Sequence, residues 1–331
     1  MSFCDLSNNL LTFDNIIDEY KQIPEIVWQN VQVHLQNGLN SNNYKTPITD
    51  WVGPTTDLYY NEHISDYENT MAFWYRFEKI EAFYSHIFNF DDRQAAQENM
   101  NALPGVTQEK ILYSIPSLTQ IDCENENCFG GANAGIFSGD NKSGWSSIRI
   151  KSTDPNTRYY RGGMYVHEFT HAISVRPFLE RADLSDITDW NSRMRSFHPC
   201  WIDEGTAHYA GLTVASRNKS EYFTQRINEI KGRQVEGFDP TNTSDVMGQI
   251  FNQNFYDCVG TPIYEAGYSV GLVIVETLSA ISGPDSILML WKLGSYGLEF
   301  SKAFEYLYGV SWEDAKPIIA EIVAKTSLDN K

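Results

Sequence analysis

Two histidines four residues apart, His167 and His171, are the residues of this sequence whose type and spacing most directly indicate chemistry. They enclose Glu168 in the segment HEFTH (residues 167–171). On a helix, side chains four residues apart project from one face, so both imidazoles can bind the same metal ion. Glu168 can then accept a proton from a water molecule on that ion. The segment therefore predicts a catalytic site with one Zn²⁺ ion as cofactor and Glu168 as general base.

A catalytic zinc site normally has three protein ligands and one open position, so a third ligand must come from elsewhere in the chain. The segment WIDEGTAHY (residues 201–209) matches a Trp-x-x-Glu-Gly-x-Ala-x-Tyr pattern that the gluzincin peptidases carry on a second helix. The chain therefore resembles the gluzincins, and the resemblance implies that Glu204 is the third ligand. Residues 172–203, between the second histidine and Glu204, form a longer interval than in the aminopeptidase group. The interval is closer to that of the bacterial collagenases, which have a similar Glu-Gly-x-Ala segment.

Three other residues compete with Glu204 for the role of third ligand: Asp189, Asp203 and His208. Asp203 adjoins Glu204, but on a helix its side chain would point about 100° away. His208 lies one turn after Glu204, where a position behind the ligands or at the surface is expected. The metzincin pattern is excluded, because Ser174 and Pro177 stand where that subclass needs Gly and His.

A third segment, PIYEAG (residues 262–267), resembles the Pro-x-Tyr/Tyr-Glu-x-Gly segment of the M1 aminopeptidase group. In that group the tyrosine hydroxyl donates to the oxyanion of the tetrahedral intermediate. The resemblance implies that Tyr264 is catalytic, since a donor aimed at developing negative charge lowers the barrier. Tyr268 and Tyr256 are the alternatives for this role, and a purely packing role for Tyr264 is the other possibility.

A glycine-rich stretch that starts at Gly130, Gly131 and Ala132 precedes the HEFTH segment. In gluzincins an edge strand at this place pairs with the substrate backbone, and small residues would let a peptide approach closely. The resemblance therefore implies substrate binding at these three residues, with a simple glycine-rich turn as the alternative. The Gly-Ala-Met-Glu-Asn segment with which the aminopeptidase group captures a free amino terminus is absent.

The resemblance implies an α+β fold similar to the thermolysin or gluzincin catalytic unit. A small mixed β-sheet lobe and a helical C-terminal lobe would then flank an active-site cleft. Residues 1–60 are expected to form a helical N-terminal extension and linker. Residues 61–178 would form the α/β lobe that ends in the HEFTH helix, and residues 179–331 the helical lobe with Glu204 and Tyr264.

The hydrophobic pattern predicts the elements that position these residues. We expect helical structure over about 13–36, interrupted at Pro24, a loop over 37–60, and one long aromatic helix over about 63–88. A strand is expected at 111–115 and a β-hairpin over 130–150. The metal-binding helix should run from 164 to about 175, with Pro177 as its stop. Further helices are predicted at 202–216, 220–231, 262–282, 284–293, 299–308 and 311–325.

Composition limits the partners. The net charge of −18 and the pI near 4.7 argue against nucleic acid, whose phosphates need clustered Lys and Arg. No transmembrane segment is expected, because no apolar run approaches 18 residues. Cys123 with Cys128, and Cys200 with Cys258, could form disulfides, and five reduced thiols are the alternative. We expect a secreted or periplasmic protein whose leader is not part of this sequence, with a cytoplasmic location as the alternative.

The sequence thus predicts a zinc-dependent peptidase that acts on peptides or proteins, and it favours an endopeptidase. A zinc aminopeptidase is the alternative among enzymes. A binding protein that keeps a gluzincin fold without activity is the alternative from another class. The oligomeric state and the substrate preference cannot be read from the residues.

Overall fold

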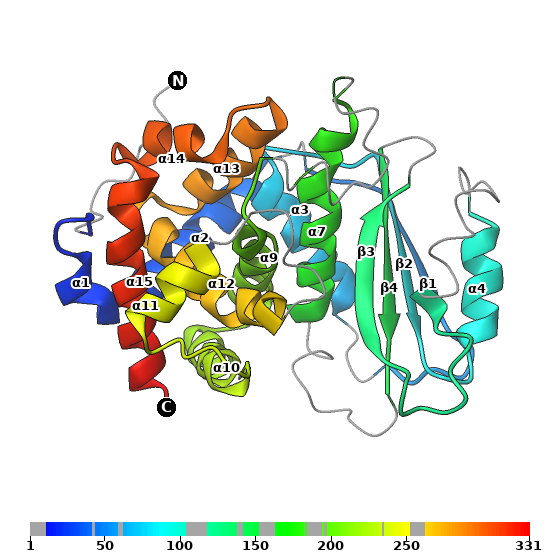
Figure 1. Cartoon of the computed structure of the whole chain (residues 1–331). Coiled ribbons are helices and arrows are strands. Elements are labelled where there is room, and N and C mark those ends of the chain that lie inside the picture. Colours follow the sequence, from blue (N-terminus) through cyan, green and yellow to red (C-terminus); the bar gives the residue numbers. More distant parts are fainter. Residues whose placement is uncertain are drawn as a thin grey trace. The chain divides into compact units, whose positions relative to one another are not determined.

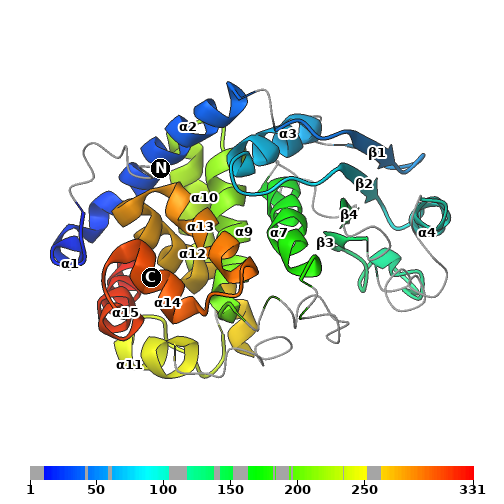
Figure 2. The same ribbon diagram turned by 90° about the horizontal axis from the view of Figure 1, so that it is seen from above.

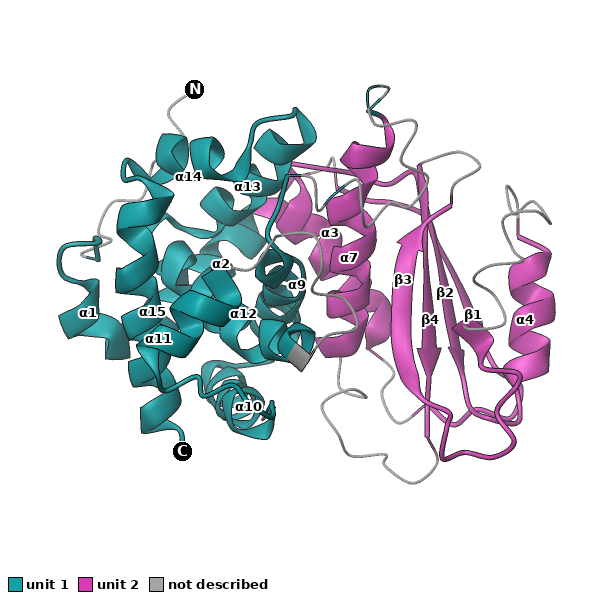
Figure 3. Ribbon diagram, in the orientation of Figure 1, with its two compact units in different colours: residues 1–37, 181–331 teal, residues 38–180 magenta. Residues whose placement is uncertain are grey.

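The computed structural model describes residues 11–41, 44–58, 62–103, 118–137, 142–151, 163–181, 183, 194, 197–233, 235–251 and 262–331. These form two compact units, one from Met1–Asn37 with Arg181–Lys331 and one from Gly38–Glu180 (Figure 3). The predicted strand at 111–115 lies outside the described residues, as do Asp189, Tyr256 and Cys258. We call the first unit the helical unit and the second the sheet unit.

The sheet unit is built on a four-stranded mixed sheet, so the chain belongs to the α+β class. Its strands are β1 (Ile48–Val52), β2 (Ala82–Phe88), β3 (Gly131–Ile136) and β4 (Ser143–Arg149). Their order in the sheet is β1-β2-β4-β3, with β1–β2 and β2–β4 parallel and β3–β4 antiparallel. Among the described strands β3 pairs with β4 alone, so it forms one edge. The predicted hairpin of β3 and β4 is confirmed.

Helices cover both faces of this sheet. The strands lie between α7 (Gly163–Leu179) on one side and α4 (Arg93–Asn101) on the other, as Figure 1 and Figure 2 both show. α3 (His63–Trp74) packs beside α7. On the α7 side the ring of Phe83 lies 4.4 Å from Phe169 and 5.0 Å from Tyr67. On the α4 side Phe88 packs with Phe129 and Met100 in a smaller core.

Two predictions about the sheet unit are wrong. The long helix expected over 63–88 is a helix, α3, followed by a strand, β2. The dense aromatic run has no single apolar stripe because β2 is covered on both faces, which removes the alternation of a half-exposed strand. The loop expected over 37–60 contains β1, whose central Thr49 and Asp50 are exposed. A short edge strand of this kind leaves little hydrophobic pattern to recognise.

The predicted end of the helix at Pro177 is also wrong. α7 continues to Leu179 with Pro177 inside it, two residues beyond the predicted stop. A proline this close to the end of a helix removes one hydrogen bond while most of the helix is already fixed by packing. At Pro24 the outcome differs, because α1 (Ile16–Glu19) and a 3₁₀ turn precede α2 (Ile23–Leu39). Pro24 lies in the first turn of α2, where proline is well tolerated.

The helical unit contains the predicted C-terminal helices, all of which are confirmed with ends that differ by a few residues. They are α9 (Cys200–Ala215), α10 (Lys219–Gly232), α12 (Pro262–Ser282), α13 (Pro284–Ser295), α14 (Phe300–Tyr308) and α15 (Trp312–Asp329). A short α11 (Thr243–Asp245) and a π-helical turn (Val246–Phe251) were not predicted. α12 lies at the centre and packs against α9, α10, α13 and α15 (Figure 1).

The N-terminal helices are integrated into this unit. The ring of Trp28 on α2 stacks on Tyr222 of α10, with 5.5 Å between centroids. His34 Nδ1 lies 2.8 Å from the carboxylate of Asp285. The unit also buries a charged cluster, because Arg226 and Tyr222 donate to Glu276 over 2.7 Å and 2.6 Å. The described part of the expected extension over residues 1–60 is therefore divided between the two units.

Candidate metal and catalytic site

α7 presents the two histidines on one face. The Nε2 atoms of His167 and His171 are 2.9 Å apart, and their rings are nearly perpendicular, with 81° between the planes. His167 is buried and His171 is partly buried. Residues 164–170 are all buried, so α7 is a core helix that packing holds on every side. The four-residue spacing therefore brings two imidazole nitrogens together on one face of the helix, as the sequence predicted.

Glu168 lies on the same helix, next to His167 and one turn before His171, and is 7 % exposed. Its charge acts on Arg149 at the end of β4, another buried side chain of the sheet unit. Burial lowers the pKa of Arg149 to about 10, and the negative charge of Glu168 opposes that shift. A pKa of about 10 keeps the guanidinium charged at neutral pH. The proposed general base therefore has a permanent cation in its electrostatic surroundings.

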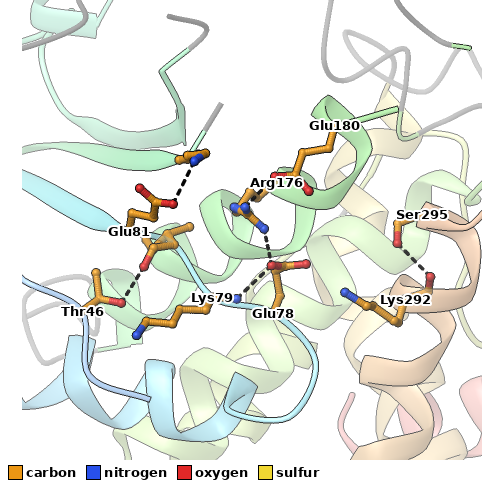
Figure 4. A network of polar contacts seen from close by, with 10 residues as sticks. Thr46, Glu78, Lys79, Glu81, Arg176, Glu180, Lys292 and Ser295 are labelled. Carbon is orange, nitrogen blue, oxygen red and sulfur yellow. Dashed lines mark hydrogen bonds and ion pairs between the residues drawn. The ribbon is translucent and has the colours of Figure 1, made fainter. Parts of the chain in front are cut away.

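The end of α7 is anchored by Arg176. Its guanidinium donates to Glu78 over 2.5 Å and to Glu180 over 2.7 Å (Figure 4). Glu78 also accepts from the backbone N–H of Lys79, in the segment that leads into β2. This bridge ties the helix of the two histidines to the chain that follows α3, which fixes the last turns of α7 past Pro177.

α9 carries Glu204 and packs very closely against α12. A Cβ added at Gly205 would lie 2.6 Å from the backbone of Gly271 on α12. The two glycines therefore allow the helix backbones to touch, and any side chain at either position would separate them. Glu204 on α9 and Tyr264 on α12 are brought together by this contact. The glycine that follows Glu204 in the sequence motif thus has a packing reason.

Glu204 is buried, with 3 % of its surface exposed. The hydroxyl of Tyr264 donates to its Oε1 atom, and the hydroxyl of Tyr268 lies 3.5 Å from that of Tyr264. Burial and the nearby charge of Glu204 raise the pKa of Tyr264 far above its ordinary value. At neutral pH Tyr264 is therefore an uncharged hydroxyl that can donate a hydrogen bond. The pair predicted from two distant motifs lies in direct contact.

His208 is buried rather than at the surface, where one reading of the sequence had placed it. Its Nε2 atom is 3.0 Å from the carboxylate of Glu229 on α10, and its ring contacts Tyr268. Arg233 stacks on the other side of this group, with its guanidinium carbon 3.8 Å from the Tyr268 ring centroid. Nothing in the sequence near His208 indicated Glu229 or Arg233, because Glu229 lies on α10 and Arg233 directly follows that helix.

His167 in the sheet unit, and Glu204 and His208 in the helical unit, are all buried, and each offers a side-chain atom that can bind a metal ion. Nitrogen and carboxylate donors of this kind fit zinc. His171 adds a second imidazole on α7, whereas Asp203 is buried on the same helix as Glu204. The metal-binding and catalytic roles of all these residues stay predictions.

Gly130, Gly131 and Ala132 lie at the start of β3, the edge strand. Gly130 and Gly131 have φ angles of +121° and +86°, which L side chains rarely adopt, so these two positions require glycine. Gly131, Ala132 and Asn133 are exposed or partly exposed, whereas the second half of β3 is buried. α7 packs directly against β3. The proposed substrate-binding residues and the two histidines thus belong to neighbouring elements of one unit.

The first of the two predicted disulfides is confirmed. Cys123 and Cys128 form a disulfide that closes the loop just before β3. Cys200, at the first position of α9, is also disulfide-bonded. The five reduced thiols of the alternative reading are therefore wrong.

No protein-family model matches this chain, and neither the curated proteins nor the solved structures give a significant match. Within the described parts of the chain no single helix is long and apolar enough to cross a membrane. The pair Ile263–Ser282 and Pro284–Ser295 would pass by length and composition alone, but it is bent by 109°.

Proposed function

We propose that this protein is a zinc-dependent peptidase with a gluzincin-like catalytic unit. The observation that carries the proposal is the convergence of two imidazole nitrogens, 2.9 Å apart, beside a buried glutamate on one helix. At this separation the two imidazoles can share a hydrogen bond, and the same arrangement lets both Nε2 atoms face one metal ion. Zinc, which takes imidazole nitrogen and carboxylate oxygen, suits this donor set.

His167, His171 and Glu204 are the proposed ligands. His208 is the competing third ligand, because it is buried and close to Glu204 in sequence. Its Nε2 atom, however, is engaged by Glu229, which favours a role for His208 beside the ligands. The carboxylate of Glu204 supplies a charged oxygen of the kind that binds zinc in proteins.

When bound, the metal would polarise the scissile carbonyl and lower the pKa of a water molecule towards 7. Glu168, beside the two histidines, would serve as the general base that takes a proton from the attacking water and returns it to the leaving amine. Tyr264, whose burial raises its pKa, would turn its one O–H from Glu204 to the oxyanion as the negative charge develops there. Low exposure of Glu168 and Glu204 strengthens these interactions, since screening by water is weak there.

The substrate is proposed to be an extended peptide that adds to the outer edge of β3, which pairs with β4 alone among the described strands. The exposed Gly131–Asn133 half of this strand supports the idea, because strand addition needs an unpaired backbone edge. An edge of this kind binds backbone on either side of a scissile bond, which favours an endopeptidase. The disulfide between Cys123 and Cys128 favours an oxidising compartment, and hence a secreted or periplasmic protein.

The test is zinc content together with peptide hydrolysis. The purified protein, dialysed against trace zinc, is expected to retain one equivalent and to cleave a mixed peptide library. His167→Ala should lose both the metal and the cleavage. A protein that binds no zinc, or that cleaves equally well after chelation, would contradict the proposal.

The aminopeptidase alternative is separated by blocking the amino terminus. Cleavage of N-acetylated peptides at internal bonds is expected from the endopeptidase. Release of single residues from unblocked peptides only, with no reaction of the acetylated series, would assign an aminopeptidase instead. Zinc binding without turnover of either series would favour the binding protein.

A further inference from the structure

Arg149 is a buried cation that holds three separate segments of the sheet unit. It is 6 % exposed and lies at the end of β4, opposite Gly131 of β3. Its guanidinium donates to the backbone oxygen of Gly130 over 3.0 Å, to that of Leu118 over 2.7 Å, and to Asn133 Oδ1 over 2.7 Å. One side chain thus fixes both ends of the exposed half of β3 and the segment that precedes it.

Stability alone does not explain this arrangement. Removing a cation from water is costly, and an ion pair with good geometry is the usual compensation. Within the described part of the chain all the hydrogen-bond acceptors of Arg149 are neutral oxygens. The rigid planar fork of arginine, with five donors spread over three nitrogens, suits three acceptors that lie in different directions.

Besides its pairing with β4, the start of this segment has few contacts of its own that define its shape. Gly130 and Gly131 have no side chain to pack, and both adopt left-handed backbone conformations. Gly130 is also held by the side chain of Gln120, whose Oε1 accepts its N–H over 2.8 Å. A Cβ at Gly131 would lie 3.3 Å from a guanidinium nitrogen of Arg149, so the side chain covers this glycine closely. Two glycines in sequence would otherwise leave the strand start flexible.

We infer that Arg149 positions the exposed half of β3, Gly131–Asn133, to receive an extended peptide of the substrate. Arg149 is a positioning residue, because it acts through the strand and does not touch the peptide. The inference rests on the proposed function and adds a residue to it that no motif indicated. The proximity of the Glu168 charge to Arg149 is consistent with this place beside the catalytic helix.

The experiment compares Arg149→Gln and Arg149→Lys with the wild type in the zinc-loaded full chain. Two blocked peptides are used, a long one that can lie along β3 and a truncated one with only the residues around the scissile bond. We expect both variants to raise KM for the long peptide roughly tenfold and to change kcat/KM for the truncated one less than about twofold. Lysine keeps the charge but lacks the fork, so it should share the defect.

Hydrogen exchange of the β3 amides provides a readout that does not depend on activity. Exchange at Gly131–Asn133 is expected to become faster in both variants, with zinc content unchanged. Arg93→Gln is the matched control. Arg93 also donates to a backbone oxygen in this unit, that of Phe90 over 2.7 Å, but it contacts no residue of β3 in the described structure. It should leave exchange and KM as in the wild type.

Unchanged exchange in β3, or an equal loss of activity on both peptides, would overturn the inference. If Arg149→Gln fails to fold, Arg149→Lys decides the question by the same two measurements. A wild type that cleaves no peptide would defeat the proposed function and with it the substrate role of Arg149. Faster exchange in the variants would then still show that Arg149 holds the start of β3 in place.

Discussion

Tyr264 and Tyr268 are one helical turn apart on α12. The hydroxyl of Tyr264 donates to Glu204, and that of Tyr268 lies 3.5 Å from the hydroxyl of Tyr264. The contact assigns different roles to two chemically identical side chains. Tyr264 is the residue whose hydroxyl is held at the proposed ligand, and Tyr268 supports it while packing against His208 and Arg233. The sequence alone left the choice open, because tyrosine is abundant in this chain.

The first prediction follows from that difference. Tyr264→Phe should lower kcat by about 10²- to 10³-fold, because one donor to the oxyanion is lost. Zinc content and KM should change little. Tyr268→Phe, the matched control, is expected to lower kcat far less. Steady-state kinetics on a blocked peptide measure both, and equal losses in the two variants would contradict the assignment.

The second prediction at this scale concerns His198. This side chain is buried against Trp291, and burial lowers its pKa from 6.5 to about 3. In the unfolded chain the His198 side chain takes up a proton as the pH falls through 6.5. In the folded chain it stays neutral until the pH falls to about 3. Stability is fully present above pH 6.5 and is lost as the pH falls, by up to about 1.4 kcal/mol per pH unit.

His198→Gln should reduce this acid sensitivity. Urea unfolding at pH 7 and pH 5 is the measurement, and the variant is expected to lose less stability between the two values than the wild type. The absolute stability of the variant at pH 7 does not enter this comparison. An identical loss in both proteins would show that another group is responsible.

At the scale of elements, the helices that carry Glu204 and Tyr264 are held by a contact between glycines. Gly205 and Gly271 allow α9 and α12 to approach until their backbones meet. The helices themselves were predictable, since α9, α10 and α12 to α15 follow long periodic patterns. The contact between α9 and α12 was not predictable, because it depends on two glycines 66 positions apart, and a glycine adds nothing to a hydrophobic pattern.

The third prediction tests this contact. Gly205→Ala places a Cβ 2.6 Å from backbone atoms of Gly271, which cannot rotate away. We expect a loss of about 1–3 kcal/mol in the free energy of unfolding, together with reduced activity, because the two helices must separate. Gly232→Ala is the control, since a Cβ there meets nothing within 4 Å. Equal stability of the two variants in urea unfolding would contradict the close approach.

The sheet unit shows where prediction from the sequence ends. The hairpin of β3 and β4 was predictable from its glycine-rich start and its turn. β1 and β2 were missed for opposite reasons: one strand is too exposed to show an apolar pattern, and the other is buried on both faces. Arg149 was missed as well, because its function depends on acceptors from Leu118, Gly130 and Asn133 that only the folded sheet brings to it.

At the scale of the whole molecule, the residues of the proposed site belong to two compact units. The sheet unit contains His167, Glu168 and His171, together with the edge strand β3. The helical unit contains Glu204 and Tyr264, with His208 and Glu229 beside them. Each half of the proposed site is internally ordered: the histidine nitrogens converge in one unit, and a tyrosine donates to a buried carboxylate in the other.

The measurement that tests the central claim most directly is hydrolysis by Glu168→Gln. The substitution keeps the size of the side chain and leaves the three proposed ligands intact, but glutamine cannot accept the proton. The variant is expected to bind one equivalent of zinc and to lose hydrolysis of a blocked peptide, with a reduction in kcat of at least about 10²-fold. A variant that retains wild-type hydrolysis while holding zinc would contradict the proposed mechanism.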